Sequence, residues 1–116
     1  MRGRLTTHVL DTSQGKPAVG MRIELWVRSS LGREPQLVKC AVTNADGRVD
    51  EPLLGSGELH IGEYELIFAV GEYYGLLEAA PFLGSVPVRF TVTDSNSNYH
   101  IPLLVAPGGY STYRGS

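Results

Sequence analysis

Residues 21–30, MRIELWVRSS, decide the fold class because apolar and polar side chains alternate along them. In an extended chain successive side chains point to opposite faces, so an alternating stretch has one apolar face and one polar face. The apolar face here consists of Met21, Ile23, Leu25 and Val27. The stretch therefore predicts a β-strand with one face packed on a core.

The same alternation returns in residues 62–70, GEYELIFAV, and in residues 86–94, VPVRFTVTD. Shorter strands are predicted in RLTTHVLD, QLVKCAVT, NYHIPLLV and the terminal GYSTYRG, and turn-forming residues separate them at 14–17, 31–35, 44–47 and 94–98. Short, regularly spaced strands favour an all-β sandwich or barrel. One short helix is predicted within residues 72–80, EYYGLLEAA, where Gly75 and Pro81 limit its length.

Length and composition predict one folded domain over residues 1–116. The chain is 42% hydrophobic and 19% charged, which is ordinary for a globular protein. The formal net charge is −2 and the basic residues are scattered, so no nucleic-acid partner is expected. No apolar run approaches the roughly 20 residues of a membrane helix, and the start of the chain lacks the apolar segment of a signal peptide. We expect a cytoplasmic protein with no membrane partner.

Cys40 and Pro102 each carry a local prediction. Cys40 is the only cysteine, so no intrachain disulfide is possible, and within QLVKCAV it is interpreted as a small buried hydrophobe. Pro102 lacks a backbone donor, which favours an edge or bulged strand for residues 98–105.

Three histidines, His8, His60 and His100, are candidates for acid–base chemistry. Each alone is more often structural, and His60 has the weakest claim because its segment is loop-like. Two histidines that bind one zinc ion would need a third protein ligand, and no residue at a suitable spacing in the sequence supplies it. No metal and no cofactor are therefore expected. Arg48 and Arg114 are surface charges by default, and either becomes functional only by converging with a histidine on an anionic, oxygen-rich substrate.

Two stretches, LTTHVLDTSQGKPA at 5–18 and YHIPLLVAPGGYSTYRGS at 99–116, resemble the 5-hydroxyisourate hydrolases, the transthyretin-related enzymes of urate degradation. The terminal YRGS is a hallmark of that family, and DGR at 46–48 and ELIFAVGEYYG at 65–75 extend the resemblance over nearly the whole chain. It implies a transthyretin-like two-sheet sandwich of about eight strands with one short helix. It also implies a homotetramer whose central channel holds the active sites.

The resemblance further implies site residues and a reaction. The matching catalytic positions are His8, Arg48, His100 and Ser116, and the matching substrate-binding positions are Ser111 and Tyr113. Water would attack a ring carbonyl of 5-hydroxyisourate and give 2-oxo-4-hydroxy-4-carboxy-5-ureidoimidazoline. One histidine would deprotonate the water and the other would protonate the leaving nitrogen, in an order that is left open. Arg48 would stabilise charge on the carbonyl oxygen.

Some alternatives stay open. Ser116 could act through its hydroxyl, its backbone amide or its terminal carboxylate, and Arg114 is interpreted as an anchor of the chain end. A transthyretin-like carrier would instead bind an aromatic ligand in the channel without catalysis. A structural interaction module of the same fold would be monomeric.

Overall fold

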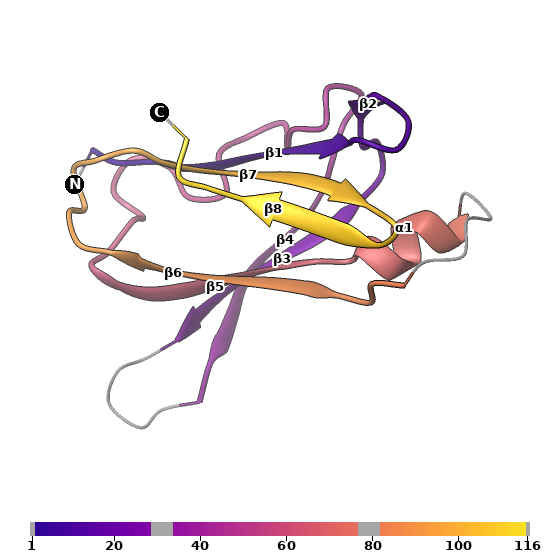
Figure 1. The fold of residues 1–116 in the computed structure, drawn as a ribbon. Coiled ribbons are helices and arrows are strands. Elements are labelled where there is room, and N and C mark those ends of the chain that lie inside the picture. The colour runs from indigo at the N-terminus through magenta and orange to yellow at the C-terminus, as the bar shows by residue number, and fades with distance from the viewer. Residues whose placement is uncertain (1, 29–33, 77–81, 116) are drawn as a thin grey trace.

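The computed structural model describes residues 2–28, 34–76 and 82–115, which form two packed sheets of four strands each (Figure 1). One sheet has the strand order β2-β1-β7-β8 and the other has the order β4-β3-β5-β6. The strands are β1 (Leu5–Asp11), β2 (Lys16–Pro17), β3 (Arg22–Arg28), β4 (Gln36–Val42), β5 (Gly62–Phe68), β6 (Val86–Val92), β7 (Tyr99–Ala106) and β8 (Gly109–Thr112). The predicted all-β sandwich is confirmed.

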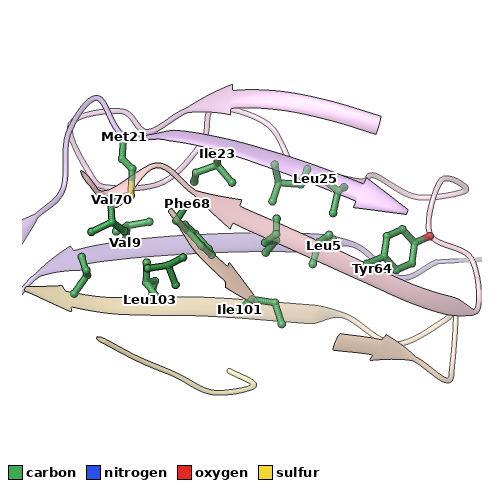
Figure 2. Packing of buried hydrophobic residues seen from close by; sticks show 14 of the residues in the cluster. Leu5, Val9, Met21, Ile23, Leu25, Tyr64, Phe68, Val70, Ile101 and Leu103 are labelled. Atoms are coloured by element: carbon green, nitrogen blue, oxygen red, sulfur yellow. The ribbon is translucent and has the colours of Figure 1, made fainter. Parts of the chain in front are cut away.

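The core lies between the sheets and is built from the alternating faces that the sequence predicts (Figure 2). In β3, Ile23 and Leu25 are fully buried. Leu66 and Phe68 of β5 are equally buried and belong to one cluster with apolar residues of β1 and β7. Burial of such side chains contributes about 1.5–3 kcal/mol each, so these two faces supply much of the stability.

The short helix α1 (Val70–Leu76) follows β5 and closes one end of the sandwich (Figure 1). It begins two residues before the predicted segment 72–80, and residues 77–81 lie outside the described part of the chain. Val70, Tyr73 and Tyr74 are buried, so the helix presents an apolar and aromatic face to the core. This burial holds a helix that would be too short to persist alone.

The pairing of β1 with β7 brings together segments 94 residues apart in sequence. The two strands are parallel, with Leu5 opposite Tyr99, Thr6 opposite His100 and His8 opposite Pro102. Because strand side chains alternate, Thr6, His8 and His100 share the outer face of this sheet. The inner face carries the buried residues of both strands.

Pro102 lies in an interior strand, because β7 is flanked by β1 and β8, so the prediction of an edge or bulged strand is wrong. The ladder between β7 and β8 covers only Leu103 to Ala106, and it stops just before the proline. The Pro102 carbonyl accepts a hydrogen bond from the Thr112 hydroxyl at 2.7 Å. The missing N–H therefore falls where β8 supplies no ladder partner.

Cys40 is exposed, which contradicts its interpretation as a buried hydrophobe. It lies on the edge strand β4 opposite Glu24, on the outer face of the sheet. Its neighbour Ala41 instead packs against the core. Among the described residues no helix is long and apolar enough to span a membrane.

A buried carboxylate, Asp11 at the end of β1, joins the strand to α1. It is fully buried and accepts hydrogen bonds of 2.8 Å from the hydroxyls of Tyr73 and Tyr74. Burial opposes its ionisation, but hydrogen bonds from Ser13, from the two tyrosines and from Gln14 outweigh burial and hold the pKa of Asp11 below its usual value. Burial and Asp11 raise the pKa of Tyr74 to about 12, so this phenol remains a donor.

We expect Asp11→Asn to lower the free energy of unfolding by about 2 kcal/mol at pH 7, because charge-assisted hydrogen bonds to a buried group are lost. The lowered pKa of Asp11 means that its contribution is complete above the pKa of an unfolded aspartate, roughly 4. The contribution is lost as the pH falls through the lower folded-state pKa. Urea denaturation at several pH values measures both effects.

Asp46→Asn is the matched control, because Asp46 is exposed. It should leave the unfolding midpoint nearly unchanged. Equal stability of the two variants at pH 7, or a difference from wild type that grows toward acid pH, would contradict the assigned role of Asp11.

Candidate active site

A cleft of about 360 Å³ opens on the outer face of the β1–β7 sheet. Its lining residues come from the start of β1, from the start of β7 and from the loop after β4, and they are Arg4, Thr6, Arg48, Asn98 and His100. Two guanidinium groups and one imidazole therefore border a single cleft. This juxtaposition brings together the predicted pair Arg48 and His100.

The ring of His100 is held on two sides. Its Nδ1 lies 2.9 Å from the hydroxyl of Thr6, and Thr6 is the residue of β1 directly opposite His100. On the other side, Gly115 donates its N–H to the His100 carbonyl at 2.7 Å. A Cβ at Gly115 would lie 2.5 Å from the Cδ2 atom of the ring, so only glycine fits there. Strand pairing and the chain end together fix the orientation of the imidazole.

Arg48 reaches the cleft through a tight turn. The Asn44 side chain accepts hydrogen bonds from the N–H groups of Asp46 and Arg48, and Gly47 has a φ of 75° that favours glycine. The Gly47 carbonyl accepts from the Val9 N–H at 2.8 Å, which docks the turn on β1. A Cβ at Gly47 would lie 3.3 Å from the His8 ring, so the turn packs directly beside that histidine.

Electrostatics of the site favour a neutral His100. Burial lowers the pKa of His100, and the positive charges of Arg48 and His8 lower it further. Arg4 lines the same cleft and adds a second guanidinium group to it. His8 is not a cleft-lining residue, but it lies within electrostatic range on the same sheet face. The site thus combines an uncharged base with cations that favour negative charge.

Ser111 and Tyr113, the predicted substrate-binding residues, lie apart from this cleft. Ser111 pairs with Leu104, four residues from His100 along β7, which corresponds to about 13 Å. Tyr113 follows β8 and is 59% exposed. Neither residue lines the cleft, and Ser116 lies outside the described residues.

Arg114 behaves as an anchor of the chain end. Its guanidinium lies 4.2 Å from the centre of the Tyr99 ring, and its Nη2 donates to the Asn98 carbonyl at 3.1 Å. Cation–π contact and hydrogen bond hold the residue before Gly115 against the start of β7. This supports the structural interpretation made from the sequence.

Sequence reasoning missed four residues that shape the site, namely Arg4, Thr6, Asn98 and Gly115. Alternation does place Thr6 on the same face as His8, but only the pairing of β1 with β7 shows that it meets His100. Within residues 2–28, 34–76 and 82–115, no three His, Cys, Asp or Glu side chains are grouped as metal ligands. Chemically, the arrangement can accept a proton at an imidazole while arginines hold an anionic group.

Comparison with known proteins places these features in a family. Residues 5–115 match the HIUase/Transthyretin family. The chain is 58% identical to the 5-hydroxyisourate hydrolase of Halalkalibacterium halodurans, and the match covers all of both chains. Among solved structures, (S)-allantoin synthase superposes with a TM-score of 0.92 at 45% identity. That match covers 99% of this chain and 44% of the synthase.

Sea bream transthyretin, solved with thyroxine, superposes with a TM-score of 0.89 at 23% identity and covers 97% of this chain and 94% of its own. This likeness shows the fold alone. The family match and the hydrolase relative both extend over nearly the whole chain. The chain therefore belongs to the HIUase/Transthyretin family.

Proposed function

We infer that this chain is a 5-hydroxyisourate hydrolase, which adds water to an oxidised purine in urate degradation. The observation that carries the inference is the convergence of His100 and Arg48 on one cleft, with His8 beside them on the same sheet face. The relative from Halalkalibacterium halodurans, named for this activity, supports it at 58% identity. Urate-derived substrates are planar and oxygen-rich, which suits a guanidinium donor.

The reaction joins one water molecule to a ring carbonyl carbon and breaks the adjacent carbon–nitrogen bond. One imidazole of the pair His8 and His100 takes a proton from the water, and the other protonates the leaving nitrogen. Arg48 stabilises the negative charge that grows on the carbonyl oxygen. The product is 2-oxo-4-hydroxy-4-carboxy-5-ureidoimidazoline, and the chemistry at these residues needs no redox step.

A transthyretin-like carrier of aromatic ligands is the alternative, and the comparisons favour the hydrolase over it. The thyroxine-bound transthyretin shares only the fold at 23% identity. Two arginines and a partly buried histidine around a cleft also suit an anionic reaction centre better than an apolar ligand. A catalytic role is therefore the better account of these side chains.

We propose a homotetramer in which Ser111 and Tyr113 line a channel with the active sites, since Tyr110 and Tyr113 at and after β8 are strongly exposed in the single chain. Ser116 would end in the same channel. We also propose the cytoplasm as compartment, because the exposed thiol of Cys40 persists best in a reducing environment.

Replacing His8, Arg48 or His100 with alanine should lower kcat by about 10²- to 10⁴-fold, the range for loss of an acid–base or charge-stabilising group. The decay of absorbance of freshly generated 5-hydroxyisourate measures the rate. His60→Ala is the matched control, because His60 is exposed and lies outside the cleft. Full activity of all three folded variants would refute the site.

An NMR titration of the imidazole should give His100 a pKa below its ordinary value of 6.5. Arg48→Gln should raise that pKa toward 6.5, because one positive charge is removed while burial remains. In the wild type, the lowered pKa favours a neutral His100 at pH 7, and base function is lost only as the pH falls through that pKa. Arg4 and His8 remain as neighbouring charges in this variant.

Arg89→Gln is the control for this titration, because Arg89 pairs with Glu65 on the opposite sheet. It should leave the His100 pKa unchanged. A wild-type His100 pKa above 6.5 would contradict the proposed electrostatics. A His100 pKa that is the same in Arg48→Gln as in the wild type would also contradict them.

Equilibrium sedimentation should give the mass of four chains at micromolar concentration. Tyr113→Glu should weaken the assembly, because it would place a charge where the proposed channel buries an aromatic ring. A monomeric wild-type protein would instead favour the interaction-module alternative.

A further inference from the structure

Thr6 is the polar side chain in closest contact with the His100 ring. Its hydroxyl lies 2.9 Å from Nδ1, and this is the one side-chain hydrogen bond of Thr6 among the described residues. No hydrogen bond to Nε2 occurs within residues 2–28, 34–76 and 82–115. The two nitrogens of the imidazole therefore face different surroundings, one bound to the protein and one free for a ligand.

We propose that Thr6 is a positioning residue whose hydroxyl accepts the Nδ1 proton of His100 and leaves Nε2 as the general base. This proposal rests on the hydrolase function inferred above. Thr6 and His100 are register partners on neighbouring parallel strands, so the backbone holds the two groups at hydrogen-bond distance. Gly115 packs against Cδ2 and limits rotation of the ring away from Thr6.

A hydroxyl suits this role because it accepts a hydrogen bond without carrying a charge. A neutral imidazole holds one proton, and the nitrogen without it is the base. A carboxylate in the place of Thr6 would stabilise the imidazolium and raise the pKa of His100. The threonine orients the ring and preserves the neutral state that burial, Arg48 and His8 favour.

The proposed step moves one proton at each histidine. Nε2 of His100 takes a proton from water while the water oxygen bonds to the ring carbonyl carbon. Collapse of the tetrahedral intermediate breaks the carbon–nitrogen bond, and protonated His8 gives its proton to the leaving nitrogen. His100 returns its proton to solvent and His8 regains one. The Nδ1–H bond to Thr6 strengthens as the imidazolium forms, so Thr6 stabilises the transition state more than the ground state.

Thr6→Val replaces the hydroxyl with a methyl group of similar volume. We expect kcat to fall about tenfold with KM nearly unchanged, because the lost interaction is strongest in the transition state. The acidic limb of the kcat profile should move to lower pH, because the imidazolium loses its acceptor. Thr6→Ser keeps the hydroxyl and should restore both properties.

Thr12→Val is the matched control. It removes a hydroxyl that donates to the Val105 carbonyl at 3.1 Å, just beyond the far end of β1 from the cleft. Its kcat and pH profile should match the wild type. If Thr6→Val lowers stability but leaves the pH profile of kcat unchanged, the proposal is overturned. It is also overturned if Thr6→Ser does not restore kcat and the pH profile.

The ring-nitrogen chemical shifts of His100 test the proposal without any assay of activity. Above its pKa, wild-type His100 should carry the proton on Nδ1, and Thr6→Val should move population to the Nε2-protonated form. A wild-type protein protonated on Nε2 overturns the role of Thr6 even if the enzyme is active. An inactive wild type with the Nδ1 proton in place refutes the hydrolase function but supports the contact.

Discussion

The parallel pairing of β1 with β7 is the constraint on which the site depends. It runs from Leu5 opposite Tyr99 to Asp11 opposite Val105 without a register shift. A slip of one residue would turn the buried face of one strand outward, which the core opposes. Burial of Val9 and Leu103 therefore fixes the outer face as well, where Thr6 meets His100. Packing in the interior positions the groups on the surface.

The two ends of this strand pair are fastened by different interactions. At one end the buried Asp11 binds Tyr73 and Tyr74 and ties β1 to α1. The other end lies near both chain termini (Figure 1). There Arg114 stacks on Tyr99 and Gly115 lies against the His100 ring. The cleft lies at this second end. Its geometry is therefore set by the last residues of the chain as much as by the strands.

Local alternation predicted the strands around Ile23, Leu66 and Val88, because a half-buried strand leaves a direct period of two in the sequence. It did not predict the parallel partner of β1, since no local signal encodes a pairing across 94 residues. Cys40 was misassigned because the sequence of this short strand does not show which of its faces meets the core, and Ala41, not Cys40, packs there. The resemblance to a family named Arg48 and His100, whereas Thr6 required the observed register.

The charges of the cleft act on the base and on the transition state together. Burial and the charge of Arg48 lower the pKa of His100, which weakens the imidazole as a base but favours its unprotonated form. In the proposed hydrolysis, the same positive field stabilises the anion that forms when water adds to the carbonyl. A carboxylate beside His100 would strengthen the base and cancel part of that field. In the proposed mechanism an uncharged hydroxyl at Thr6 orients the imidazole and leaves the field of the arginines intact, so this mechanism requires a neutral orienting group.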